Sequence, residues 1–315
     1  MPFDTTEISR GCATELLRGF TEKDLIVTGI RRLHGGMVNS VLELATDGDP
    51  KLVVAKLCAE PGQGGFEWEY RVLKWYRENT AFPVPEPYGF DLSGKVFPGS
   101  CLMMERLPGD NLGQVRLGVA DRMAVERQMA RILVDLHGHR RETYGSALEP
   151  GEGGPARWLD RFGARIRSEF EAAADRLSPQ ARRAIERTLE RLEDWLPEFG
   201  DPTLVHGDLW ATNIIVNPDG PEGPAISGFV DGGAEYAEVE YELAYLLVFH
   251  TVGSAFFAEY SRLRPLREGF QTRCRIYWLN TMMLHVRYFG DAHYVQACER
   301  LAEEVGRLGP RAAQP

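Results

Sequence analysis

The sequence contains few cysteines, and none stands at a metal-binding or redox spacing. Its five cysteines are scattered over 315 residues, and no Cys-x-x-Cys pair occurs. An odd, widely spaced set is typical of reduced thiols in a cytosolic protein rather than of a disulfide framework. We therefore expect a cytoplasmic protein without a cysteine-bound zinc ion.

Long apolar runs and an excess of positive charge are also missing. No segment approaches the roughly 18 apolar residues of a membrane span, and residues 1–17 carry early acidic groups instead of a signal-peptide core. The formal net charge is −10, whereas nucleic-acid binding needs a basic surface. We expect neither a nucleic acid nor a membrane as partner, but an acidic surface would attract a cationic small molecule.

What the sequence does contain is the material of a globular α+β protein. Hydrophobic residues make up 43% and charged residues 26% of the chain, whose length suffices for one large domain or two smaller ones. Runs of β-branched and apolar residues predict strands before about residue 110, and helical periodicity predicts helices after it. The expected strands are 25–33, 39–45, 52–58 and 100–107, with a helix at 66–79. The expected later helices are 122–139, 158–177, 179–196 and a helical region from 240 onward.

Two polar segments of the second part could carry chemistry. In "LVHGDLWATNIIV", residues 204–216, Asp208 and Asn213 stand five apart before a short apolar strand, and in "ISGFVDGG" Asp231 ends another short strand before two glycines. Asp208 could serve as a general base. Asn213 and Asp231 could hold Mg²⁺, a hard cation that prefers oxygen ligands. Each residue taken alone could instead belong to a turn or a hairpin.

The first part supplies candidates for binding phosphates. Lys56 lies in the apolar strand "LVVAKLC", where an unpaired buried charge would be costly, and Glu69 on the following helix is its expected partner. The turn "HGGMVNSV" could close its backbone N–H groups over phosphates, although a two-glycine turn is also an ordinary hairpin. Phosphoryl transfer needs these parts together: a metal, a cation on the phosphates and a carboxylate facing the acceptor hydroxyl.

The order of these features resembles a known family. A glycine-containing turn, a strand lysine, a helix glutamate, His-x-Asp with asparagine five residues later and a strand aspartate resemble the protein-kinase set. The forms "HGDLW", "CLMMERLPGDNL" and "LVDLHGH" are similar to the aminoglycoside phosphotransferase and choline kinase group. Trp210 and the tail "YWLNTMMLHVRYFGDAHY" resemble the fructosamine-kinase branch of that group. The resemblance covers about residues 25 to 300.

The resemblance implies a bilobal, protein-kinase-like α+β fold, with a β-rich N-lobe at 1–107 and a larger helical C-lobe at 108–315. It implies an ATP- and Mg²⁺-dependent kinase of a hydroxyl group on a small molecule, with GTP as the alternative nucleotide. Asp208 would orient or deprotonate the acceptor hydroxyl, and Asn213 and Asp231 would hold Mg²⁺. The implied nucleotide-binding residues are Lys56 with its partner Glu69, Gly35, Gly36 and Asn39 of the phosphate loop, Met104 beside the adenine, and the backbones of Glu105 and Leu107.

On the acceptor side the sequence departs from the fructosamine-kinase pattern. The glycine after the tyrosine is Ala237, the aspartate before Leu-Ala is Glu242, and Asp-Pro-Ala is Asp231-Gly232-Gly233. We therefore expect an amino sugar or an aminoglycoside-type antibiotic as the acceptor, consistent with a resistance enzyme, and a fructosamine-like ketoamine as the alternative.

Candidate contacts to such a cationic acceptor follow from the nearby aromatic and acidic residues. They are the ring of Trp210 and the carboxylates of Glu235, Glu238 and Glu240. An acidic run of this kind is also typical of a solvated face. His137 and His206 are interpreted as structural residues rather than proton carriers.

Two further interpretations belong to other classes. A catalytically silent kinase-fold binding module would usually lack the strand lysine, the base or a metal ligand, and all of these are present. A protein kinase would carry an Asp-Phe-Gly to Ala-Pro-Glu segment after residue 231, and the sequence has none. The sequence is compatible with a monomer or a homodimer.

Overall fold

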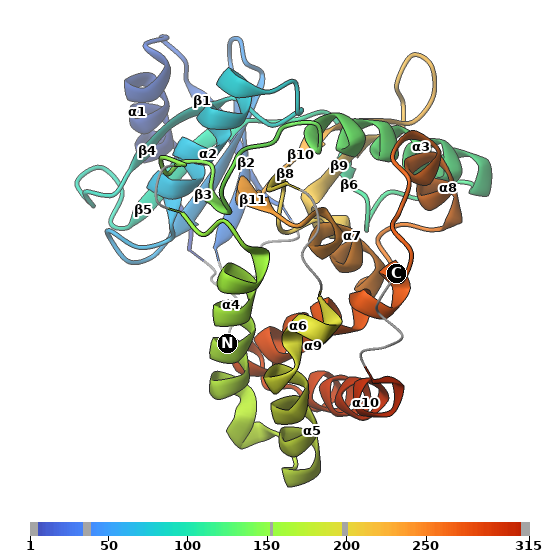
Figure 1. Ribbon diagram of the computed structural model, residues 1–315. Helices are drawn as coiled ribbons and strands as arrows, with labels where there is room; N and C mark the ends of the chain where they lie inside the picture. The colour runs from blue at the N-terminus through green and yellow to red at the C-terminus, as the bar shows by residue number, and fades with distance from the viewer. Residues whose placement is uncertain (1–5, 34–38, 152–153, 197–200, 310–315) are drawn as a thin grey trace. The chain divides into compact units, whose positions relative to one another are not determined.

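The computed structural model describes residues 6–33, 39–151, 154–196 and 201–309 (Figure 1). The chain packs as two compact units. We call Met1–Gly118 with Ala211–Gly233 the sheet unit, and Val119–Trp210 with Ala234–Pro315 the helical unit. The lobe boundary expected between residues 107 and 108 stays a prediction.

A five-stranded antiparallel sheet forms the main layer of the sheet unit, in the order β1-β2-β3-β5-β4. Helix α1 (Arg10–Thr21) packs against β1 and β4, and α2 (Phe66–Asn79) packs against β4 and β5 (Figure 1). The strands are β1 Val27–Arg32, β2 Ser40–Thr46, β3 Leu52–Cys58, β4 Pro87–Asp91 and β5 Ser100–Glu105.

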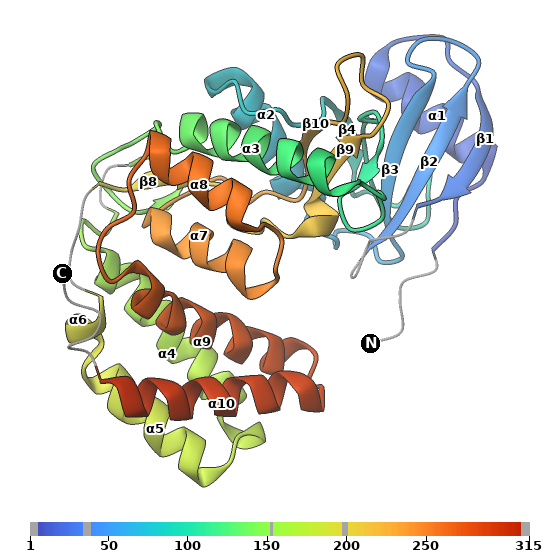
Figure 2. The ribbon, with the colours of Figure 1, turned by 90° about the vertical axis from the view of Figure 1, so that its right-hand side faces the viewer.

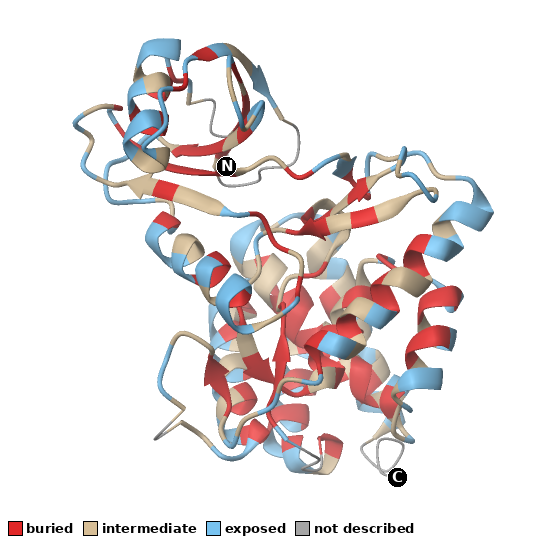
Figure 3. Ribbon diagram, turned by 90° about the horizontal axis from the view of Figure 1, so that it is seen from above, coloured by how far each residue is buried: buried red, intermediate tan, exposed pale blue. Residues whose placement is uncertain are grey.

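The core of this sheet forms because apolar residues alternate along the strands and recur on one face of α1. Leu42 and Leu44 of β2, Val53 of β3, and Leu16 and Leu17 of α1 are all buried in one cluster. Burial of each such aliphatic side chain contributes roughly 1.5–3 kcal/mol. Most positions of β2, β3 and β5 are buried or half-buried, and Figure 3 colours the ribbon by this burial.

A second, three-stranded sheet of the sheet unit has the order β10-β9-β6. Its strands are β6 Asp110–Asn111, β9 Ile214–Asn217 and β10 Ala225–Phe229, and the 3₁₀ turn η2 (Ala211–Asn213) leads into β9. Phe229 ties this sheet to the segment before β4, because its N–H donates to the Pro83 carbonyl at 2.8 Å and its ring stacks on Phe82. Through β9 and β10, Asn213 and Asp231 belong to the same unit as Lys56.

The helical unit is built mainly from packed helices. α9 packs against α4, α7 and α10, and α3 packs against α8 (Figure 2). A small sheet of order β7-β11-β8 accompanies them. The elements are α3 Val119–Leu136, β7 Gly145–Ser146, α4 Trp158–Ala173, η1 Ala174–Arg176, α5 Pro179–Glu190, α6 Leu192–Trp195, β8 Thr203–Val205, β11 Glu235–Ala237, α7 Val239–Val248, α8 Ser254–Leu263, α9 Phe270–Tyr288 and α10 Ala292–Leu308.

The predicted α+β class and most expected elements agree with the structure, and the differences are local. The helix expected at 179–196 is broken at Arg191, where φ is −118° and ψ is 28°, and a short helix follows that buries Leu192 and Trp195. The short strand expected to end at Asp231 spans Ala225–Phe229 and so ends two residues earlier. No described helix combines the length and the apolar character needed to cross a membrane.

Candidate active site

Lys56 lies in the middle of β3, where strands flank it on both sides. It pairs with Val41 of β2 and Leu102 of β5, and its side chain is buried. Its ammonium group lies 2.6 Å from Glu69 Oε1 on α2 and also contacts Asp231 Oδ1. The buried charge therefore has the partner expected from the sequence, Glu69, and a second one in Asp231.

The charges in this cluster do not cancel, because one lysine faces two carboxylates. Burial opposes the positive charge of Lys56, but Asp231 and Glu69 outweigh it and raise the lysine pKa. Burial raises the pKa of Glu69 as well, against the attraction of Lys56. The three groups therefore carry a net negative charge when all of them are ionised. A further cation would reduce the repulsion between the two carboxylates.

Asn213 and Asp231 stand at neighbouring positions at the ends of β9 and β10. The Val230 N–H donates to the Asn213 carbonyl at 3.0 Å, which extends the pairing of Ile214 with Phe229 by one step. Asp231 itself has a φ of 62°, in the left-handed region, so the chain turns sharply at this residue. An asparagine amide oxygen, buried here, and a carboxylate oxygen are ligands suited to Mg²⁺, so the donor set fits this ion.

The residues expected to bind adenine follow the end of β5. Met104 is buried, and Glu105 pairs with Glu86 through the Glu105 N–H and carboxylate, at 2.8 and 3.0 Å. The sequence did not single out Arg106, which lies 2.9 Å from Glu43 of β2 and donates to the carbonyls of Leu107 and Gly109. Arg106 therefore fixes the backbone on which the predicted adenine contacts lie.

The expected phosphate loop is described only in part. Gly35 and Gly36 lie outside the described residues. Asn39 donates from Nδ2 to the Gly64 carbonyl at 3.3 Å, and its Oδ1 is buried without a hydrogen-bond partner in the described chain. The roles of these three residues stay predictions.

In the helical unit, the loop after β8 carries Asp208. The loop is held by its backbone, because the Gly207 N–H donates to Glu242 Oε1 at 2.8 Å and the Asp208 N–H lies 3.3 Å from His206 Nδ1. Gly207 has a φ of 89°, a conformation that favours glycine. His206 is fully buried, which agrees with its interpretation as a brace for this loop.

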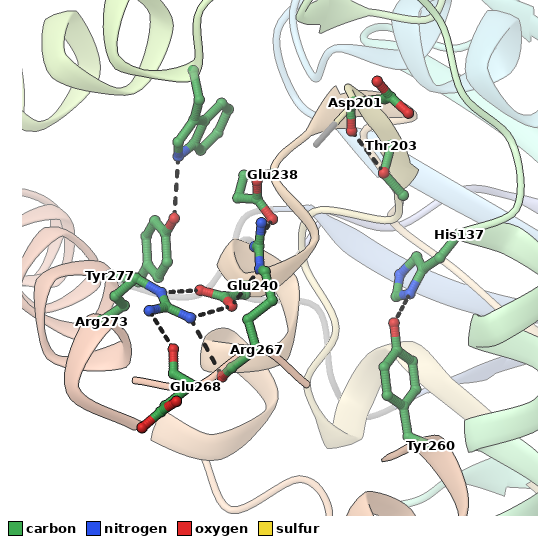
Figure 4. A network of polar contacts seen from close by, with 11 residues as sticks. His137, Asp201, Thr203, Glu238, Glu240, Tyr260, Arg267, Glu268, Arg273 and Tyr277 are labelled. Carbon is green, nitrogen blue, oxygen red and sulfur yellow. Dashed lines mark hydrogen bonds and ion pairs between the residues drawn. The ribbon is translucent and has the colours of Figure 1, made fainter. Parts of the chain in front are cut away.

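Glu242 and His137 form a buried pair behind this loop. His137 Nε2 lies 2.8 Å from Glu242 Oε2. His137 Nδ1 lies 2.8 Å from the Tyr260 hydroxyl, a contact drawn in Figure 4. The His137 carbonyl accepts a hydrogen bond from Arg264. His137 is therefore structural, as its place at a helix end suggested.

The sequence matches the profile of the phosphotransferase enzyme family over residues 29–271. The chain belongs to this family. The prediction of a small-molecule kinase related to aminoglycoside phosphotransferases and fructosamine kinases is thereby confirmed.

Individual relatives agree with this membership of the phosphotransferase family. A probable ketoamine kinase of Enterococcus faecium is 28% identical over 279 residues, which cover 85% of this chain and 92% of the relative. A chloroplastic protein-ribulosamine 3-kinase of Oryza sativa is 26% identical over 283 residues, which cover 85% and 76%. The structure of a candidate fructosamine-3-kinase from Thermobifida fusca is similar with a TM-score of 0.74 at 22% identity, over 93% of this chain and 98% of the other. The kinase-like fold class is thus also confirmed.

The three glutamates that the sequence suggested as contacts to a cationic acceptor, Glu235, Glu238 and Glu240, form ion pairs with arginines in the structure. Glu235 pairs with Arg161 and Arg165 of α4, at 2.7 and 3.0 Å. Glu238 and Glu240 face Arg267 and Arg273 (Figure 4). Glu238, Glu240 and Arg273 are buried, so the run is not a solvated face.

Half-exposed aromatic rings gather beside Asp208. The ring of Phe249 lies 6.5 Å from Trp210, 4.9 Å from Tyr245 and 5.2 Å from His285 between centroids. The Tyr245 hydroxyl, in turn, donates to Asp208 Oδ1. Tyr245 was missed at the sequence level because its position in α7 marks only helical periodicity, and its contact is 37 residues away.

Proposed function

We propose that this phosphotransferase transfers the terminal phosphoryl group of Mg²⁺-bound ATP to a hydroxyl group of a fructosamine- or ribulosamine-type ketoamine. The observation that carries the kinase chemistry is the contact of buried Lys56 with both Glu69 and Asp231. Catalysis of phosphoryl transfer rests on positioning and charge neutralisation. It therefore requires a fixed cation near a carboxylate that can bind a metal ion.

Each residue of the sheet unit would have one task in binding the nucleotide. Lys56 would contact the phosphates, held in place by Glu69 at 2.6 Å. Asn213 and Asp231 would hold Mg²⁺, which supplies positive charge that neutralises the phosphate oxygens. Glu105 and Leu107 would present backbone groups to the adenine, on a segment that Arg106 braces.

Asp208 of the helical unit would orient the acceptor hydroxyl and accept its proton. Asp208 would form no covalent bond to the phosphoryl group, because most of the rate enhancement would come from positioning the hydroxyl and neutralising the phosphate charge. A hydrogen bond from Tyr245 and the anchoring of Gly207 by Glu242 keep the Asp208 carboxylate and its backbone in a defined place.

The proposed acceptor class rests on three observations. Relatives named as ketoamine and ribulosamine kinases match along 85% of the chain. Glu235, Glu238 and Glu240 already face arginines, which disfavours them as the binding groups of a polycationic aminoglycoside. The rings of Trp210, Phe249 and His285 near Asp208 instead offer apolar faces against which a sugar ring or its amine substituent can pack.

The test is a screen of the purified protein with Mg²⁺ and ATP against fructosamines, ribulosamines, aminoglycosides and choline. ADP release and the mass of the product are measured, and the 3-hydroxyl named for the rice relative is the first candidate site. We expect phosphorylation of a ketoamine, and its loss by orders of magnitude in Asp208→Ala with unchanged ATP binding. Phosphorylation of aminoglycosides alone would overturn the ketoamine, and an inert panel would overturn the substrate proposal altogether.

A further inference from the structure

Helix α7 turns two side chains toward the loop that carries Asp208. Glu242 and Tyr245 are three residues apart, so they lie on the same helix face. Glu242 Oε1 accepts from the Gly207 N–H at 2.8 Å, and the Tyr245 hydroxyl donates to Asp208 Oδ1 at 2.5 Å. One helix face therefore holds both the backbone of the loop and the carboxylate itself.

We propose that Tyr245 is a positioning residue for phosphoryl transfer, which acts by fixing the rotation of the Asp208 carboxylate. This inference rests on the proposed role of Asp208 in the kinase reaction. A carboxylate can rotate about its Cβ–Cγ bond, and the torsional preference of such a bond is broad. A hydrogen bond from Tyr245 to Oδ1 restricts this rotation and so sets the direction in which the lone pairs of Oδ2 point.

The chemical state of Tyr245 supports a donor role. Burial, with the charge of Asp208 as the next cause, raises the Tyr245 pKa far above its ordinary value. The phenol therefore remains protonated, and its O–H donates a hydrogen bond to the Asp208 carboxylate. Hydrogen bonds to an ionised partner are stronger than neutral ones, so this contact is able to hold the side chain.

The surrounding rings keep Tyr245 itself in place. Its ring meets Phe249 edge-on at a centroid distance of 4.9 Å, and Phe249 in turn contacts His285 of α9. Such contacts leave the ring unchanged when only the hydroxyl is removed. Tyr245→Phe therefore deletes the hydrogen bond to Asp208 and preserves the packing.

The experiment compares the kinetics of Tyr245→Phe with those of the unaltered enzyme, on whichever acceptor the screen identifies. We expect kcat to fall about tenfold, the amount that corresponds to a hydrogen bond to a charged group. The KM for ATP should stay within about twofold, because the nucleotide-binding residues are untouched. Tyr277→Phe is the matched control, since it removes a buried hydroxyl that accepts from Trp158 and does not contact Asp208.

A second comparison separates positioning from a general loss of structure. In an Asp208→Ala background, adding Tyr245→Phe should cause no further loss of turnover, because the hydroxyl acts only through the carboxylate. A kcat of Tyr245→Phe equal to that of the unaltered enzyme would overturn this inference alone. A loss of the same size in both backgrounds would also overturn it. A protein that phosphorylates nothing would end the proposed function, and this inference with it.

Discussion

His137 and Glu242 are joined by a hydrogen bond of 2.8 Å, and neither side chain is exposed to solvent. The second oxygen of Glu242 accepts from the Gly207 N–H, and the second ring nitrogen of His137 contacts the Tyr260 hydroxyl. The Glu242 carboxylate of α7 thus links the end of α3 to the loop before Asp208, and His137 extends this network to α8. Glu242, one of the residues that depart from the fructosamine-kinase pattern, therefore supports the loop that carries Asp208.

This network predicts that Glu242→Ala lowers the free energy of unfolding by about 3 kcal/mol, because His137 and the Gly207 N–H lose a buried partner. The measurement is urea unfolding at neutral pH. Glu303→Ala, at an exposed glutamate of α10, is the control and should change stability by less than about 0.5 kcal/mol. Equal losses in the two variants would contradict the role assigned to Glu242.

The pair of Glu238 and Arg267 predicts a dependence of stability on pH. Burial raises the pKa of Glu238 from 4.5 to about 7, although Arg267 opposes this shift. The native state then binds the proton more tightly than the unfolded chain does. This contribution is fully present below about pH 4.5 and is lost as the pH rises through about 7.

The magnitude of this effect is on the order of 2–3 kcal/mol across that window. It is measured as the difference in unfolding free energy between the unaltered protein and Glu238→Gln at a series of pH values. We expect the difference to change in favour of Glu238→Gln as the pH rises from 4.5 to 7. A difference that stays constant would show that Glu238 has the same pKa in both states.

The features found from the sequence are those with a local signal. Lys56 was recognisable because a lysine in an apolar strand needs a partner, and Glu69 follows on the next helix. Asn213 and Asp231 stood out as candidate metal ligands because polar residues at strand ends contrast with apolar runs, and this role stays a prediction. Their contacts also place Lys56, Glu69 and Asp231 together.

The features missed from the sequence depend on contacts between distant segments. Tyr245 and Arg106 reach partners 37 and 63 residues away, at Asp208 and Glu43, and nothing in their neighbours marks this. The arginine partners of Glu235, Glu238 and Glu240 could not be predicted for the same reason. Glu240 is neutralised by Arg273, 33 residues later, and a single sequence does not tell which of its many arginines folds back.

The cluster at Lys56 predicts that Lys56→Met lowers kcat/KM for ATP on the order of 100-fold, since it removes the cation and leaves Glu69 and Asp231 without it. Steady-state kinetics with varied ATP measures this effect. Lys51→Met serves as the control, because Lys51 is exposed and does not contact these carboxylates. Unchanged ATP kinetics in Lys56→Met would exclude Lys56 from nucleotide binding.

The placement of Asn213 beside Asp231 predicts a change in the Mg²⁺ requirement. Asn213→Ala removes one neutral oxygen ligand and keeps the carboxylate, so the Mg²⁺ concentration for half-maximal activity should rise about tenfold at saturating ATP. Binding of Mn²⁺ in the presence of a non-hydrolysable ATP analogue, followed by electron paramagnetic resonance, gives a readout independent of turnover. Asn217→Ala is the matched control at the other end of β9, because the Asn217 side chain accepts from the Asp219 N–H in a turn. If both variants need the same Mg²⁺ concentration as the unaltered enzyme, Asn213 does not bind the metal.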